Sequence, residues 1–316
     1  LRGSGPRRGR PPGGPAAVGM KLSELGELGL LKLLRPHLSG AGLELLIGAG
    51  EDDAAAWREP DGSITVATCD SFVEGVHWDF GVLTPEEAGW RSLALTVSDL
   101  AAKGAQPTYG LVAFAAPPDY AAASAEGLYR GLAASAEACR LKLVGGDTTA
   151  TAGPASLTVM ALGRAAVEPI PRRAARPGWQ LAVTGPLGGA AAGHADAFRR
   201  PRPRLREGAL LSAAGLCCGD ISDGLVRELD KFAAMAGVGA RLNLDAIPLA
   251  SGSSREQAAA SGEEMELVCA GPPGAILKAA ELLTVVGELT ADGRVLVVDA
   301  EGREVQLEVR GYSHFG

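Results

Sequence analysis

Aspartates are the residues of this chain best suited to do chemistry, because most of them follow short apolar runs where strands are expected to end. The set comprises Asp52, Asp53, Asp70, Asp99, Asp147, Asp220 and Asp223. Any one of them alone is explained equally well as an ordinary turn or cap residue. Carboxylate oxygens are also the ligands that Mg²⁺ prefers, and the ion commonly bridges them to phosphates. As a set, the aspartates predict a site for divalent cations that carry a polyphosphate.

The sequence lacks the familiar motifs of other phosphate-handling and hydrolytic sites. It contains no Gly-x-x-x-x-Gly-Lys-Ser/Thr, no His-Arg-Asp loop, no His-Glu-x-x-His and no Gly-x-Ser-x-Gly. The glycines between Leu181 and Gly193 do not follow the dinucleotide-binding pattern. Phosphoryl transfer depends on positioning and charge neutralisation more than on a covalent nucleophile. The acidic set therefore suits a metal-assisted transfer of this kind.

Strand-like and helix-like patterns alternate along the chain, which is typical of an α/β or α+β fold. We expect helices over 22–34, 85–103, 119–139 and 225–236, and strands over 43–49, 64–69, 108–115, 141–144 and 156–163. Residues 181–193 should form a strand, a glycine turn and a helix. The Pro- and Arg-rich segment 165–178 predicts a boundary between an N-terminal domain, 20–164, and a C-terminal domain, 165–316. Residues 1–19 are expected to be a disordered extension or an expression remnant that precedes Met20.

The helix that should position Asp99 has a clear start. Thr84 is a suitable N-cap, Pro85 takes the first helical position and Glu87 completes a capping box. Asp99 then falls in the last turn, where the helix dipole disfavours a negative charge. A positive partner is required, and either Lys103 or a metal ion meets that need.

Composition excludes several classes of protein. The chain has 316 residues, 47% of them hydrophobic, and a formal net charge of -7, so it has no general basic surface for nucleic acid. No apolar run approaches the roughly 20 residues that span a bilayer. The five cysteines are odd in number and show no Cys-x-x-Cys spacing, which favours a reducing, cytoplasmic location.

Six motifs stand in a fixed order over nearly all of residues 20–316. They are GEDDAA (50–55), TCDSFVEGVH (68–77), SDLAAKGA (98–105), GGDTT (145–149), DISDG (220–224) and GYSHF (311–315). This series resembles the thiamine-monophosphate kinase family, which is part of the aminoimidazole-ribonucleotide synthetase superfamily. The resemblance implies a two-domain α/β subunit of that superfamily's fold, whose N-terminal sheets pair across a homodimer.

The resemblance also implies an activity and a set of roles. The activity is direct in-line transfer of the ATP γ-phosphate to thiamine monophosphate, with several Mg²⁺ ions. Carried over motif by motif, the metal ligands are Asp53, Thr68, Cys69, Asp70, Asp99, Asp147, Asp220 and Asp223, with Asp70 and Asp147 as catalytic residues. Arg172 and Ser222 contact ATP in this assignment, and His77, Glu263 and Tyr312 line the thiamine phosphate pocket.

Three positions depart from the family's pattern. Cys69 stands where a hydroxyl residue is usual, Ala150 where an arginine commonly follows Asp-Thr-Thr, and Met265 where an aromatic residue is usual. Two alternatives stay open on these grounds: another ATP-using enzyme of the superfamily, or a binding paralogue without turnover. Hydrogenase-maturation dehydratases would need a reactive cysteine at the C-terminus, and selenophosphate synthetases one near the start. Neither is present here.

Overall fold

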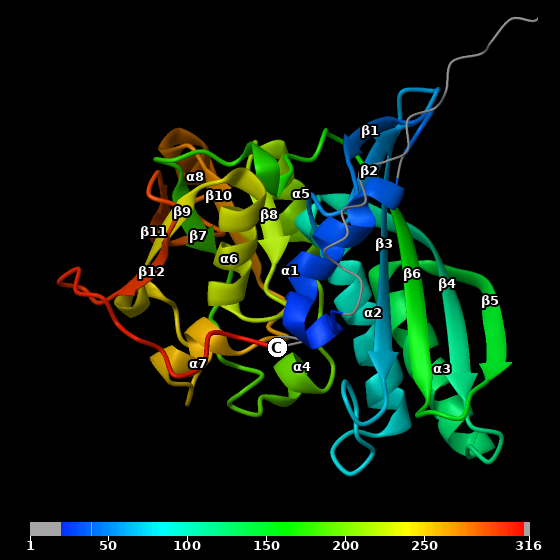
Figure 1. Ribbon diagram of the computed structural model, residues 1–316. Coiled ribbons are helices and arrows are strands. Elements are labelled where there is room, and N and C mark those ends of the chain that lie inside the picture. Colours follow the sequence, from blue (N-terminus) through cyan, green and yellow to red (C-terminus); the bar gives the residue numbers. More distant parts are fainter. Residues whose placement is uncertain (1–19, 39, 313–316) are drawn as a thin grey trace, which may run out of the picture.

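The computed structural model describes residues 20–38 and 40–312, which form two six-stranded sheets with helices packed against them (Figure 1). The first sheet has the order β1-β2-β3-β6-β4-β5, and its neighbours are antiparallel except for the pair β4–β5. Its strands are β1 (Glu44–Ile47), β2 (Ala55–Arg58), β3 (Ile64–Val73), β4 (Ala105–Ala116), β5 (Lys142–Ala150) and β6 (Ser156–Ala165). The expectations for residues 1–19, and for the part of the GYSHF motif after Tyr312, fall outside the described residues.

The second sheet has the order β12-β9-β11-β7-β10-β8, with β12–β9 parallel and the other neighbours antiparallel. Its strands are β7 (Gln180–Val183), β8 (Cys217–Asp220), β9 (Gly239–Asn243), β10 (Leu267–Gly271), β11 (Thr284–Thr290) and β12 (Val295–Val298). The α-helices are α1 (Leu22–Leu34), α2 (Pro85–Ala102), α3 (Ala122–Cys139), α4 (Ala195–Phe198), α5 (Leu205–Ala213), α6 (Leu225–Ala236), α7 (Arg255–Ala260) and α8 (Pro273–Lys278). The 3₁₀ turns are η2 (Arg35–His37), η3 (Arg172–Ala174) and η4 (Leu244–Ala246).

Helix α2 lies between the two sheets and contacts both (Figure 1). It begins as expected: the Thr84 hydroxyl accepts a hydrogen bond from the Glu87 amide at 3.2 Å, and the Glu87 carboxylate accepts one from the Thr84 amide at 2.8 Å. Its neighbours approach its backbone closely. A Cβ on Gly208 of α5 would lie 1.9 Å from the carbonyl oxygen of Ala101 in α2. This contact fixes the end of α2 that carries Asp99.

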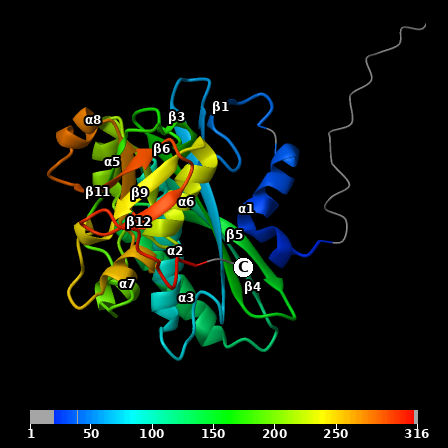
Figure 2. The same cartoon turned by 60° about the vertical axis from the view of Figure 1, so that its left-hand side comes forward.

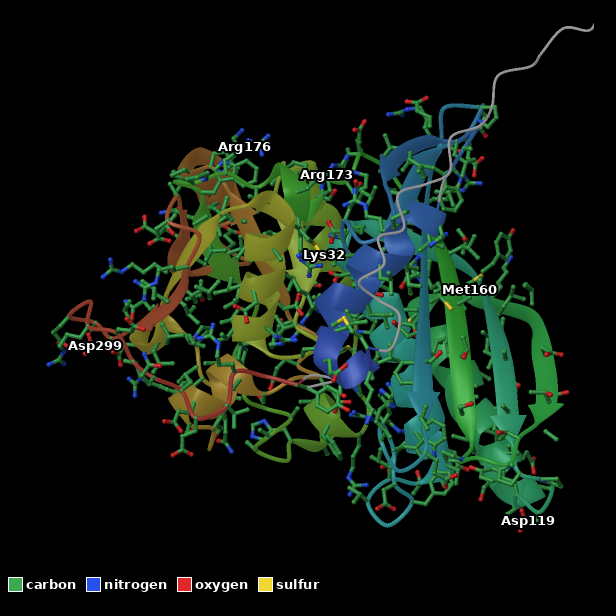
Figure 3. All side chains as sticks on the ribbon, viewed as in Figure 1. Lys32, Asp119, Met160, Arg173, Arg176 and Asp299 are labelled. Atoms are coloured by element: carbon green, nitrogen blue, oxygen red, sulfur yellow. The ribbon has the colours of Figure 1, made fainter. Side chains whose placement is uncertain are left out.

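The two faces of the first sheet differ. Helices α2 and α3 lie on one face (Figure 2), and buried side chains there alternate along the strands with side chains that point to the other face. The other face carries Tyr109, Leu111, Val144 and Met160, which are between 38% and 60% exposed (Met160 is labelled in Figure 3). A contiguous apolar face of this kind is typical of an interaction surface.

Buried side chains gather in separate cores. One core lies between the first sheet and helices α2 and α3, and its fully buried members fall between Ile47 and Ala165. Two others surround the second sheet, and all but one of their members, Ala102, fall between Ala175 and Val297. The expected mixed α/β architecture with two domains is confirmed. The placement of the boundary after residue 164 stays a prediction.

Several elements differ from expectation. Strand β5 continues through Gly145 and Gly146, so Asp147 lies within a strand and does not follow a turn; Gly146 is required because a Cβ there would lie 1.7 Å from the carbonyl oxygen of Val112. Strand β2 differs from the elements expected from the sequence, and no helix forms between Gly185 and Gly193. Among the described residues, no helix combines the length and apolar character needed to cross a membrane.

Candidate functional site

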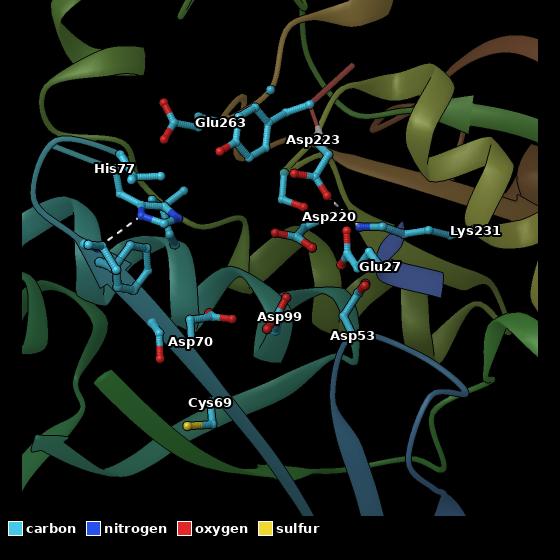
Figure 4. Close-up of a pocket in the computed structure, with 18 residues that line it drawn as sticks. Glu27, Asp53, Cys69, Asp70, His77, Asp99, Asp220, Asp223, Lys231 and Glu263 are labelled. Atoms are coloured by element: carbon cyan, nitrogen blue, oxygen red, sulfur yellow. Dashed lines mark hydrogen bonds and ion pairs between the residues drawn. The ribbon is translucent and has the colours of Figure 1, made fainter. Parts of the chain in front are cut away.

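A cavity of about 780 Å³ collects most of the predicted site residues from both halves of the chain (Figure 4). Those that line it are Asp53, Cys69, Asp70, His77, Asp99, Asp220, Ser222, Asp223, Glu263 and Tyr312. Thr68, Asp147 and Arg172 are not among its lining residues. The structure thus brings together aspartates that lie up to 170 positions apart in the sequence.

Three carboxylates converge at one side of the cavity. Asp53 from the turn before β2, Asp99 from α2 and Asp220 from the end of β8 each place an oxygen within 4.8 Å of the other two. The Oδ2 atom of Asp53 is buried and has no hydrogen-bond partner among the described residues. An unpaired buried oxygen is costly unless a ligand satisfies it. The three acids and this oxygen fit a divalent cation such as Mg²⁺.

Strand β3 presents its motif to both faces of the sheet, because successive side chains alternate. The Thr68 hydroxyl is buried and donates a hydrogen bond to Oδ2 of Asp99 at 2.5 Å. Asp70 lines the cavity, and the intervening Cys69, which is exposed, also borders it. Thr68 is therefore a partner of Asp99 in this structure, and metal-ligand roles for Thr68 and Cys69 stay predictions.

Burial and mutual repulsion shift the pKa values of these acids. Burial, followed by the charges of Asp70 and Asp220, raises the pKa of Asp99 well above its ordinary value. Burial and the nearby Asp53 raise the pKa of Asp220 to about 7, and burial raises that of Asp70 to about 6. Burial also acts to raise the pKa of Asp53, but the charges of Arg172 and neighbouring lysines outweigh it and lower this pKa to about 2. The ionised cluster is therefore unfavourable without a cation.

These shifts predict a pH-dependent response to metal. Because the pKa values of Asp70, Asp99 and Asp220 are raised on folding, the folded state binds more protons than the unfolded state above about pH 4, and stability falls as the pH rises towards 7. We expect Mg²⁺ to raise the Tm of chelator-treated protein more at pH 8 than at pH 5.5. Differential scanning fluorimetry with and without Mg²⁺ measures this. An equal rise at both pH values would contradict it.

Arg172 lies behind the acidic cluster and is fully buried. Its guanidinium pairs with Asp53 and, at 3.2 Å, with Asp52, and Nη2 pairs with Glu228 at 2.5 Å. Gly219 leaves room for it, since a Cβ there would lie 2.0 Å from Nη2. Arg172 thus holds Asp53 in place from outside the cavity, and the expected ATP contact stays a prediction.

Lys103 takes part in the same network and does not offset Asp99 as its spacing suggested. Its buried ammonium pairs with Asp52 and donates to the carbonyl oxygen of Cys218 at 2.5 Å. It thereby links α2 to strand β8. Among the ion pairs of the described residues, none therefore involves Asp99, whose carboxylate accepts a hydrogen bond from Thr68.

The other side of the cavity carries His77 and Glu263 (Figure 4). Tyr312 also lines the cavity, and its amide donates a hydrogen bond to the carbonyl oxygen of Asp223 at 3.0 Å. Nδ1 of His77 accepts a hydrogen bond from the Val73 amide at 3.0 Å, so a neutral ring carries its proton on Nε2 and acts there as a donor. The ring also meets Phe72 edge to face, with centroids 5.7 Å apart. These contacts fix the imidazole at the cavity wall.

Glu263 sits on a strained loop. Its φ is 61°, and that of Met265 is 55°, both in the left-handed region that few non-glycine residues adopt. The buried Arg91 of α2 holds the Glu263 carboxylate at 2.5 Å. A loop strained at two positions and tied to α2 is typical of a binding site.

The remaining predicted residues fall in two places. Asp147 is exposed on the edge strand β5, in register with Ala113, and so lies away from the described cavity. Ser222 and Asp223 line the cavity, and they do not cap α6, whose N-cap is Gly224 without a side-chain cap bond. Asp223 pairs instead with Lys231 at 3.2 Å.

Sequence reasoning missed two charged residues of the cavity, Glu27 on α1 and Lys231 on α6. Glu27 lies in a leucine-rich helix, and no local signal sets it apart from a solvent-exposed acid. Lys231 lies on α6, the helix that follows the DISDG motif, three positions after Glu228. That spacing was the available signal, since residues three apart share a helix face.

Comparisons with known proteins agree with this geometry. The family described as AIR synthase related protein, N-terminal domain, matches residues 51–165. The solved structure described as AaThiL complexed with AMPPCP and TMP superposes with a TM-score of 0.80 at 27% identity, over 93% of this chain and 99% of that one.

Two curated thiamine-monophosphate kinases match nearly the full length. The protein of Bacillus subtilis (strain 168) is 29% identical over 85% of this chain and 93% of its own length. The protein of Escherichia coli (strain K12) is 31% identical over 92% of this chain and 98% of its own length. With its cavity, its fold and these relatives, the chain belongs to the thiamine-monophosphate kinase family.

Proposed function

We propose that this protein transfers the γ-phosphate of ATP to thiamine monophosphate and so forms thiamine diphosphate. One observation carries the proposal: carboxylates from both halves of the chain converge in one cavity, where an unpaired oxygen of Asp53 fits a cation. The relative whose structure is described with AMPPCP and TMP supports the choice of substrates. Transfer is direct, from ATP to the acceptor, with no covalent intermediate on the protein.

The acidic side of the cavity would hold Mg²⁺. Asp53, Asp99 and Asp220 supply the converging ligands, with Asp70 and Asp223 lining the same space. When bound, Mg²⁺ would neutralise the charge of the polyphosphate and of the transferred group. Asp147 lies outside this set in the single subunit, so its assigned metal-binding and catalytic role is a separate prediction.

The chain's own residues position the reactants. Arg172 and Thr68 hold Asp53 and Asp99 from behind, so these carboxylates are preorganised before substrates arrive. Ser222 lies beside Asp223 at the cavity wall, and there it would contact ATP. His77, Glu263 and Tyr312 would receive the thiamine part, which orients the acceptor phosphate towards the acidic side.

The exposed face of the first sheet is where a second subunit would pair. Tyr109, Leu111, Val144 and Met160 form an apolar surface there that no described helix covers. Burying such a face in a symmetric homodimer is a common solution. In this arrangement the two N-terminal sheets face each other, as the family resemblance implies.

A coupled ADP-release assay tests the proposed function. The protein is incubated with ATP and Mg²⁺, with and without thiamine monophosphate. ADP that forms only when the acceptor is present, together with thiamine diphosphate seen by chromatography, is the expected result. Nucleotide binding by calorimetry without acceptor-dependent ADP would identify a binding paralogue and overturn the kinase assignment.

Replacing Tyr312 with Ala should raise the KM for thiamine monophosphate more than the KM for ATP. Tyr312 lines the same cavity as His77 and Glu263, and losing a stacking contact is worth about 1 kcal/mol, or about 5-fold. Steady-state kinetics with each substrate varied in turn measures the two constants. Equal rises in both would place Tyr312 outside the acceptor pocket.

A further inference from the structure

Lys231 is a cation in a cavity that acids dominate. Among the cavity-lining residues that the structure describes, it is the one lysine, and none is an arginine. Its side chain is 18% exposed, and its ammonium lies 3.2 Å from Oδ2 of Asp223 and 2.7 Å from Oε1 of Glu228. An ammonium at this place can bind an anionic ligand that enters the cavity.

The position of Lys231 on α6 directs its ammonium into the cavity. Leu229 and Phe232 bury one side of the helix in the core. Long helical side chains lean towards the N-terminus of their helix, and Nζ of Lys231 accordingly lies beside Asp223, which precedes α6. Figure 4 shows Lys231 with Asp223 and Asp53 on one side of the cavity and His77 on the other. The ammonium therefore belongs to the side with the converging carboxylates.

Structural pairing alone does not account for Lys231. Glu228 is fully buried, but it already has a cationic partner, because Nη2 of Arg172 lies 2.5 Å from its Oε2. The other partner, Asp223, lies at the cavity wall and is itself a candidate metal ligand. The ion pair of Lys231 with Asp223 is therefore a contact that an anionic ligand can replace.

We propose that Nζ of Lys231 binds a phosphate oxygen of the nucleotide at the acidic side of the cavity. A lysine serves phosphates as a compact point charge with three donors. On binding, its contact with Asp223 passes to the phosphate, and Asp223 is released to act as a ligand. The inference rests on the proposed function for the identity of the nucleotide, and it assigns Lys231 to the donor and not to the acceptor phosphate.

Three variants test the assignment. Lys231→Met keeps the length of the side chain and removes its charge, Lys231→Arg keeps the charge, and Lys278→Met removes an exposed lysine at the end of α8. The full-length variants are titrated with AMPPCP in Mg²⁺, and separately with thiamine monophosphate, by isothermal calorimetry. Melting curves confirm that each is folded, and Lys231→Gln replaces the Met variant if that one melts early.

We expect Lys231→Met to weaken AMPPCP binding about 10-fold or more, as for loss of a hydrogen bond to a charged group. Lys231→Arg should recover most of the affinity, and Lys278→Met should bind as the unaltered protein does. Thiamine monophosphate binding should change less than about 2-fold in all of them.

Unchanged AMPPCP affinity in folded Lys231→Met would overturn the inference. A loss of affinity for thiamine monophosphate alone would also overturn it, because Lys231 would then contact the acceptor phosphate. The two proposals fail separately. If the unaltered protein forms no acceptor-dependent ADP while AMPPCP binding still depends on Lys231, the kinase assignment falls and the phosphate contact stands.

Discussion

Replacing Asp70 with Asn should lower kcat by at least about 100-fold. In the proposed function its carboxylate helps to hold Mg²⁺, and an amide would remove a charge that stabilises the transition state by several kcal/mol. Asp70 lines the cavity from strand β3, where it is in register with Val159 of β6, so we expect the substitution to leave the backbone in place. Coupled ADP release at saturating Mg²⁺ measures the loss.

Stability provides a second readout for the same variant. Burial raises the pKa of Asp70 to about 6, so its ionised form destabilises the metal-free fold at neutral pH. The Tm of metal-free Asp70→Asn should therefore equal or exceed that of the unaltered protein. Asp61→Asn, in the exposed turn before β3, is the matched control and should keep full activity. Near-normal turnover of Asp70→Asn would remove Asp70 from the metal site.

Replacing Arg172 with Ala should destabilise the fold by about 3 to 5 kcal/mol, since removing one partner of a buried ion pair leaves uncompensated charge. The guanidinium is fully buried and serves Asp52, Asp53 and Glu228 together. Urea denaturation, with the free energy of unfolding extrapolated to water, measures the effect.

The neighbouring residue provides the control. Arg173 is 42% exposed and pairs with Glu51 at 2.8 Å at the surface (Figure 3). Arg173→Ala should cost about 0 to 1 kcal/mol, as exposed pairs do. If both variants lose the same stability, the buried network does not carry the role that its geometry suggests.

Local sequence signals predicted the elements that position the site. The Thr84 capping box marks the start of α2, and Gly237, in the left-handed conformation, marks the end of α6. Such signals can be found in the sequence because they act over a few residues. The convergence of Asp53, Asp99 and Asp220 followed from the number and order of the acids and from the family resemblance. No single aspartate carried that information.

The sequence could not show how the buried charges pair. Lys103 stands four positions after Asp99, which suggests a local pair, yet it pairs with Asp52, 51 positions earlier in the sequence, and donates to Cys218 of β8. Arg172 was assigned to ATP for its motif, although its surroundings bury it completely. Strand β5 ran past two glycines that usually mark a turn, because β4 pairs with it along its length. In each case a distant segment determined the outcome.

The close approach of glycines to helix α2 has a mechanical consequence. Where Gly89 meets the carbonyl oxygen of Leu128, and Gly208 that of Ala101, main chain rests on main chain without an intervening side chain. Such joints cannot yield by a change of rotamer, so the position of α2, and with it that of Asp99, is fixed relative to helices α3 and α5. Any opening of the enzyme to admit substrates must then come from its loops, and not from sliding of this central helix.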